Sequence, residues 1–285
     1  MLCIVAIIDV WTSTPAPRLE HHGATLTGRD QMSRRLRALA IVTLCCVTAV
    51  FAQPSGGLWG RRDLRYDSRL TFVRLRWTGG TFGAPPVGMG INMWLHEFPG
   101  AERNLMSVLG NFTQIDANTT GSLTLSIDDP DLFKYPVAMM WEPGFWVMTD
   151  EQATLLQAYL HKGGFIIFND FEARQWDNFA AQLRRVLPDA QLIRLDATHP
   201  IFNTFFHIDR IDTPNPINHH LGGYTPEYFG VFEDNDPTGR LMAIVNYNTN
   251  LGEFWQLAGT GLLPFEAENT GFRIGINYMM YGLTH

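Results

Sequence analysis

Residues 135–141 read YPVAMMW, and residues 149–171 read TDEQATLLQAYLHKGGFIIFNDF. The first segment and the FIIF run at 165–168 are continuous apolar stretches, typical of strands that are buried on both faces of a parallel sheet. Between them, Thr149 precedes Gln152 by three residues, which is the spacing of a capping box, and a helical apolar pattern follows until a Gly-Gly pair ends it. Strand, helix and strand in this order predict a βαβ unit.

The same alternation continues on both sides of this unit. Further strands are expected at 70–77, 122–127 and 192–195, further helices at 98–110, 176–187 and 266–283, and a hairpin from 229–232 and 241–247. A long ordered loop is expected over 197–227, and a mobile glycine-rich loop over 78–93. The pattern predicts a three-layer α/β fold: a mainly parallel sheet flanked by helices, with a C-terminal hairpin and a closing helix.

The N-terminal part reads as a targeting signal. Residues 33–53 are SRRLRALAIVTLCCVTAVFAQ, with three arginines, a 14-residue apolar run, and Val50 and Ala52 at the −3 and −1 positions of a cleavage site. A bilayer-spanning helix needs about 20 apolar residues, so a cleaved signal peptide is favoured over an uncleaved anchor. We expect Sec export rather than the twin-arginine route, and a secreted or periplasmic product with no membrane span after cleavage.

These features divide the chain into four parts. Residues 1–31 are interpreted as an upstream extension outside the fold, 32–52 as the signal peptide, 53–69 as a linker and 70–285 as a single α/β domain. All three cysteines, Cys3, Cys45 and Cys46, precede the expected cleavage point. The mature chain therefore has no thiol nucleophile and no thiolate metal ligand.

The net charge also limits the partners. The chain carries 28 Asp and Glu against 21 Lys and Arg, a net charge of −7, and has no basic run. Binding to a phosphate backbone requires clustered positive charge, so we expect no nucleic-acid partner. An unknown small polar ligand or a protein partner is expected instead.

Six segments, in this order, resemble a known family. They are TFVRLRW at 71–77, FPGAERNL at 98–105, DDPDLFKYPVAMMWEPG at 128–144, the segment at 149–171 quoted above, THPIFNTFF at 198–206 and GINYMMYGLTH at 275–285. Together they resemble the bacterial domain of unknown function DUF4159, over residues 70–285. The resemblance implies a flavodoxin-like scaffold similar to that of the class I glutamine amidotransferases, and it implies no established activity. The family often has two acidic residues where this chain has Asn169 and Asp170.

Ligands of open parallel sheets bind beyond the carboxyl ends of the strands. This rule predicts a ligand site for a polar neutral molecule along one rim of the sheet. Its expected residues are Thr78, Trp141, Glu142, Asn169 and Asp170. The indoles of Trp141 and Trp146 are also candidates for a stacking platform.

Two functions are compatible with this rim. The turn after the central strand has no Cys or Ser nucleophile, which favours a non-catalytic ligand- or protein-binding module on an amidotransferase-like scaffold. The alternative is a carboxylate-dependent hydrolase for a small or carbohydrate substrate, with Asp170, Glu172 and Glu142 as catalytic residues. In the first case, Asp170 caps its loop and Glu172 is solvated.

We expect no cofactor and no metal. His199 and His207 lie in a loop-rich stretch together with His219 and His220, and they provide a weaker alternative for a zinc-type site. Their spacings match no zinc motif.

Overall fold

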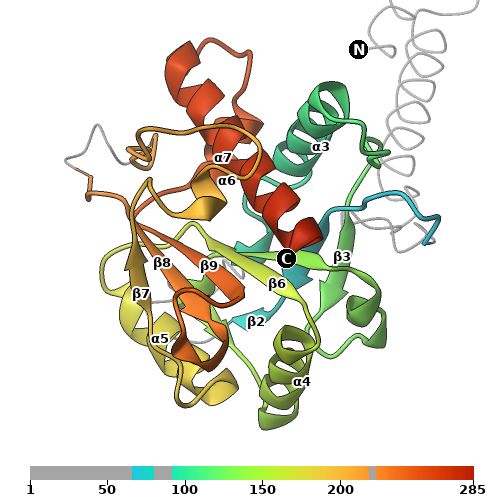
Figure 1. Ribbon diagram of the computed structural model, residues 1–285, viewed down its shortest axis with the longest axis vertical. Helices are drawn as coiled ribbons and strands as arrows, with labels where there is room; N and C mark the ends of the chain where they lie inside the picture. The colour runs from blue at the N-terminus through green and yellow to red at the C-terminus, as the bar shows by residue number, and fades with distance from the viewer. Residues whose placement is uncertain (1–65, 80–91, 218–222) are drawn as a thin grey trace, which may run out of the picture. The chain divides into compact units, whose positions relative to one another are not determined.

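The computed structural model in Figure 1 describes residues 66–79, 92–217 and 223–285. Every described residue belongs to one compact unit, Gly57–His285. The expected upstream extension and signal peptide, all three cysteines, most of the expected linker and glycine-rich loop, and His219 and His220 lie outside the described residues.

The fold is a three-layer α/β arrangement around one seven-stranded sheet with the order β3-β1-β4-β6-β9-β8-β7. Strands β3, β1, β4, β6 and β9 run parallel, while β8 is antiparallel to both β9 and β7. The sequence-based expectation of a mainly parallel sheet is therefore confirmed. The strands of this sheet are β1 (Val73–Arg76), β3 (Leu123–Ser126), β4 (Val137–Trp141), β6 (Phe165–Asn169), β7 (Ile193–Leu195), β8 (Glu227–Phe232) and β9 (Leu241–Tyr247), and β2 (Thr78–Gly79) and β5 (Trp146–Val147) form a separate two-stranded ribbon.

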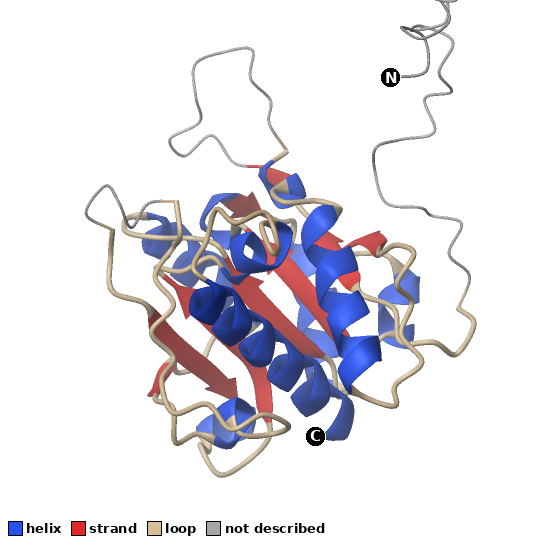
Figure 2. Cartoon of the chain, turned by 90° about the horizontal axis from the view of Figure 1, so that it is seen from above, coloured by secondary structure: helices blue, strands red, loops and turns tan. Residues whose placement is uncertain are grey.

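Helices cover both faces of the large sheet (Figures 1 and 2). One apolar cluster joins the sheet to α4 (Asp150–His161) and α5 (Gln175–Val186). A second cluster joins the opposite face to α3 (Gly100–Phe112), α6 (Leu251–Gln256) and α7 (Phe265–Thr284). Short 3₁₀ helices occupy Met93–Leu95 (η1), Pro130–Lys134 (η2), Pro143–Phe145 (η3), Pro200–Phe202 (η4) and Glu233–Asn235 (η6).

The helix that follows β4 begins as its sequence predicts. The Thr149 side chain accepts a hydrogen bond from the Gln152 backbone N–H, and the Gln152 side chain accepts one from the Thr149 N–H, both over 3.1 Å. This capping box fixes the start of α4 and the path of the chain out of β4.

The C-terminal hairpin is confirmed, and it has a second role. Strand β9 pairs antiparallel with β8, and it also pairs in parallel with β6 through Ile166–Ala243, Ile167–Ile244 and Phe168–Val245. The carboxyl end of β9 therefore joins those of β4 and β6 on one rim of the sheet. Residues that follow Tyr247 belong to this rim, which the hairpin prediction alone does not indicate.

A buried arginine on β1 fixes the chain segment above this rim. The Arg74 side chain is fully buried, forms an ion pair with Glu102 of α3, and lies 3.5 Å over the Trp141 ring. Its Nη1 donates to the carbonyl oxygens of Trp94 at 2.7 Å and His96 at 2.8 Å. Residues 92–97, called the rim strap below, are thereby held against the carboxyl ends of β1 and β4.

In the described part of the chain, no helix has the length and apolar character needed to cross a membrane.

Replacing Arg74 tests how strongly the strap depends on it. Arg74→Met leaves the Glu102 carboxylate buried without a cation, and we expect a loss of about 3–5 kcal/mol in the free energy of unfolding. The double variant R74M/E102L removes both charges and should recover most of that loss. Urea denaturation measures both values.

The matched control is Arg194→Met. The Arg194 side chain forms an exposed ion pair with Glu227 at 2.7 Å, and such pairs contribute about 1 kcal/mol or less. A double variant no more stable than R74M would contradict the role given to the buried charge pair.

Candidate functional site

Two carboxylates follow neighbouring strands at the rim. Trp141 ends β4 beside Asn169, which ends β6, so the next residues, Glu142 and Asp170, lie close together. Both adopt left-handed backbone conformations, with φ of 51° and 66°. This region is uncommon for residues other than glycine, and its occupation costs of the order of 1 kcal/mol or more. The sharp turn brings both side chains to the wall of one cavity.

The His96 imidazole joins these carboxylates from the rim strap. Its Nδ1 lies 2.6 Å from Asp170 Oδ2, 3.4 Å from Glu142 Oε1 and 3.6 Å from Glu97 Oε1. The His96 side chain is 48% exposed, whereas the three carboxylates are buried. The imidazole therefore separates a group of buried acids from solvent.

Glu97 is held by a buried polar network. Its carboxylate accepts hydrogen bonds from the indole N–H of Trp141 and from the side-chain amide of Asn250. The Asn250 Oδ1 accepts from the Asn169 amide at 3.1 Å and from the Glu253 N–H at 3.2 Å, which caps α6. The network links the strap to the ends of β4, β6 and β9.

Burial raises the proton affinity of the acids. Burial raises the pKa of Glu97 to about 7, with a further contribution from the charge of Asp170. It also raises the pKa of Asp170 to about 7, aided by Glu142, and the pKa of Glu253 to about 7, aided by Glu97. The pKa of Glu142 is raised for the same reason, burial. The cluster therefore retains protons near neutral pH.

The carboxylates have the opposite effect on the histidine. Hydrogen bonds to Asp170 and then to Glu142 raise the pKa of His96 to about 11, against the opposing effect of burial. The cluster thus pairs one imidazolium with acids that are only partly ionised, and its groups exchange protons as a unit.

The cavity at this cluster has a volume of about 150 Å³, enough for a small polar group. Its lining comes from the strap, from the turns after β4, β6 and β9, and from the chain before the undescribed residues 218–222. The lining residues are His96, Glu142, Asp170, Phe171, Glu172, Gln175, Asn215, Ile217, Asn250 and Glu253.

The structure brings together only part of the site expected from the sequence. Glu142, Asp170 and Glu172 line the same cavity. Asn169 and Trp141 are fully buried beneath it, and both polar atoms of the Asn169 amide are used by Asn250 and by the Leu251 N–H. Thr78 lines a different cavity, beside β1.

The structure contradicts the hypothesis that Trp141 and Trp146 form a stacking platform for a ligand. The side chains of Trp141 and Trp146 are both fully buried, because Trp141 packs against Arg74 and Trp146 packs against Phe168. Neither indole offers a face to a ligand.

His199 and His207 are engaged separately. The His199 side chain accepts a hydrogen bond from the Ile201 N–H and caps η4, and burial lowers its pKa. The Nε2 of His207 pairs with Asp209 at 2.7 Å. Neither residue belongs to a group of three potential metal ligands in the described ranges.

Among those ranges, one group of three could hold a metal ion. A nitrogen of His96 and one carboxylate oxygen each from Glu97 and Asp170 lie within 4.8 Å of one another. A mixed imidazole and carboxylate set suits divalent cations of intermediate hardness.

Reasoning from the sequence missed His96, Glu97, Asn250 and Glu253. The rule that ligands bind beyond the carboxyl ends of parallel strands points to residues 248–253 once β9 is recognised as parallel to β6. His96 and Glu97 follow no strand of the large sheet directly. Only their adjacency, as a His-Glu pair just before a helix, marks them in the sequence.

Comparison with known families agrees with the resemblance found in the sequence. A family model described as "Domain of unknown function (DUF4159)" matches residues 87–283, more than two thirds of the 285-residue chain. No curated protein matches the chain.

Gly252 of α6 provides a test of the buried network. A Cβ at this position would lie 2.1 Å from the Glu97 Oε2 and 2.6 Å from the Trp141 indole nitrogen. We expect Gly252→Ala to separate these two groups and to lower the free energy of unfolding by about 1–3 kcal/mol. Chemical denaturation followed by fluorescence measures the change.

The matched control is Gly110→Ala in α3, where the Cβ would meet the Ala117 Cβ at an ordinary 3.6 Å. Alanine in a helix is favoured over glycine by about 0.5–1 kcal/mol, so this variant should be neutral or slightly more stable. Equal effects of the two variants would contradict the tight packing around Glu97.

Proposed function

We propose that this chain, which belongs to the DUF4159 family, is a hydrolase that uses buried carboxyl groups to cleave a small, neutral, polar substrate. The observation that carries the proposal is the meeting of Asp170, Glu142 and His96 in one cavity, with a single imidazole nitrogen 2.6 Å and 3.4 Å from the two carboxylates. Acid and base side chains with shifted pKa values in one cleft are typical of catalytic sites.

The two carboxyl groups take different parts in the reaction. Asp170 has the closest contact with the imidazolium of His96, which favours its ionised form, so it acts as the general base. Glu142 is farther from that charge and acts in its protonated form as the general acid. Two acids in one cavity with different surroundings can divide these roles.

Water is the nucleophile in the proposed hydrolysis. A water molecule gives a proton to Asp170 while its oxygen bonds to the electrophilic carbon of the substrate. The bond from that carbon to the leaving group breaks, and the leaving group takes the proton of Glu142. Proton exchange between the two carboxyl groups and solvent restores the starting state.

The surroundings restrict the substrate. Five acidic side chains and one histidine surround the site, so a substrate with negative charge at the reacting bond is disfavoured. The cavity of about 150 Å³ admits a small group at the scissile bond.

The lack of a cysteine or serine nucleophile favours the binding-module hypothesis. That lack does not exclude hydrolysis, because a hydrolase can use water as its nucleophile. In the proposed reaction, water is the nucleophile. The position of Asp170 beside His96, rather than on a loop N–H as a cap, supports the hydrolase over the module.

Hydrolysis can be tested with a panel of chromogenic neutral glycosides, esters and amides. We expect turnover of at least one substrate class, and a loss of about 10²–10⁴-fold in kcat in both Asp170→Asn and Glu142→Gln, because each removes one proton-transfer group. Glu151→Gln, on the exposed surface of α4, is the matched control and should keep full activity.

Two results would contradict the proposal. One is the absence of turnover on every substrate class; the other is activity that survives both substitutions. Activity lost in EDTA and restored by Zn²⁺ or Mn²⁺ would replace Asp170 as the base with a cation-bound water held by His96, Glu97 and Asp170.

We also infer that the chain is exported, on the basis of the arginines, apolar run and cleavage-site residues within 33–53. Expression of the full chain in a bacterial host should give an extracytoplasmic product that begins near Gln53. Intact-mass measurement of fractionated cells checks this, and a cytosolic product that retains residues 32–52 would contradict it.

A further inference from the structure

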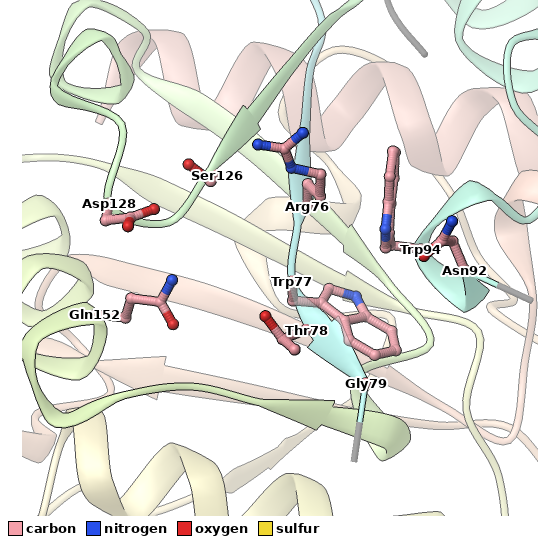
Figure 3. A pocket seen from close by; sticks show the side chains of 9 residues that line it. All are labelled: Arg76, Trp77, Thr78, Gly79, Asn92, Trp94, Ser126, Asp128 and Gln152. Atoms are coloured by element: carbon pink, nitrogen blue, oxygen red, sulfur yellow. The ribbon is translucent and has the colours of Figure 1, made fainter. Parts of the chain in front are cut away.

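A second and larger cavity lies beside the site described above, at the carboxyl ends of β1 and β3 (Figure 3). Its volume is about 580 Å³, within the range of small-molecule binding sites. Most of the side chains around it are polar, and two indoles supply apolar walls. The lining residues are Arg76, Trp77, Thr78, Gly79, Asn92, Trp94, Ser126, Asp128 and Gln152.

The rim strap forms a wall of both cavities. Trp94 lines the second cavity, and His96, two residues later, lines the first. Arg74 holds the carbonyl oxygens of both residues. Among the described residues, the second cavity shares no lining residue with the cavity at the carboxylate cluster, so a ligand there has its own set of contacts.

The charges of the described residues that line the second cavity balance. Among these residues, Arg76 is the one cation and Asp128 the one anion. A hydrogen bond from Ser126 lowers the pKa of Asp128, with smaller contributions from Gln152 and from the charge of Arg76, so this carboxylate is ionised. Such a site has no excess positive charge for a phosphorylated or otherwise anionic ligand.

Several hydrogen-bonding groups remain open to a ligand. Within the described ranges, the Arg76 guanidinium has no hydrogen-bond acceptor, and the side chains of Thr78 and Asn92 make no hydrogen bond. Figure 3 shows Asp128 and Gln152 on one side of the cavity, Asn92 on the other, and Arg76 between them. A ligand in this space can accept a hydrogen bond from the Arg76 guanidinium and donate one to the Asp128 carboxylate.

Neutral sugars match these requirements. Each hydroxyl group can both donate and accept a hydrogen bond, so a polyhydroxylated ring can serve Arg76, Asn92, Thr78 and Asp128 together. Trp77 and Trp94 are largely buried, and the parts of their side chains that line the cavity provide apolar contact for the carbon face of a ring. We propose that this cavity is a binding site for a neutral mono- or disaccharide. The proposal rests on the second cavity alone and does not depend on hydrolysis at the carboxylate cluster.

The test uses maltose, cellobiose and N,N′-diacetylchitobiose as probes, with saturation-transfer NMR to detect binding and calorimetry to measure it. We expect at least one of them to bind at millimolar concentration or tighter. Arg76→Met and Asp128→Asn should each weaken binding about tenfold or more, since each removes a hydrogen bond to a charged group. Thr78→Val, which keeps the side-chain shape at an exposed position, should weaken it severalfold and serves where the other variants fold poorly.

Two matched controls separate this site from the other one. Glu142→Gln changes only the carboxylate cavity, and Arg194→Met removes an exposed arginine elsewhere on the sheet edge. Both should leave the sugar affinity unchanged. Failure of all three sugars to bind, or tighter binding of glucuronate or inorganic phosphate, would overturn the proposal. So would binding lost in Glu142→Gln but retained in Arg76→Met and Thr78→Val.

Discussion

The buried guanidinium of Arg74 is the constraint on which the rim of this protein depends. It contacts α3 through Glu102, β4 through the ring of Trp141, and the strap through the carbonyls of Trp94 and His96. A buried charge requires such partners, because desolvation of an unpaired ion costs several kcal/mol. Even so, Arg74 Nη2 and Glu102 Oε2 have no hydrogen-bond partner within the described ranges. The pair therefore fixes the strap more clearly than it stabilises the fold.

The carboxylate cluster makes a second unfavourable contribution to the stability of the fold. Glu97, Glu142 and Asp170 all have positive φ, and all three are buried acids with raised pKa values. Strained backbone and desolvated charge persist only where the surrounding structure enforces them, and they concentrate at functional sites. Here the enforcing structure is Arg74 together with the Trp141, Asn250 and Asn169 network. The buried acids at the rim destabilise the fold, and the two apolar clusters on the faces of the sheet stabilise it.

The sequence predicts what depends on local pattern. The capping box at Thr149, the buried runs of β4 and β6, and the positions of Glu142 and Asp170 after those strands all follow from short-range signals. The sequence does not reveal which distant segments contribute residues to the site. His96 reaches Asp170 across 74 residues, and Asn250 reaches Glu97 across 153 residues. Asn169 looks like a ligand contact in sequence because its polarity is visible, whereas its burial beneath Asn250 depends on where β9 pairs.

The two cavities differ in charge although they share one wall. Among the described lining residues, the first cavity has several acids around one imidazole, and the second has one guanidinium and one carboxylate. Trp94 and His96 are two residues apart, and the same nitrogen of Arg74 binds both of their carbonyl oxygens, so one buried cation positions a wall residue of each cavity.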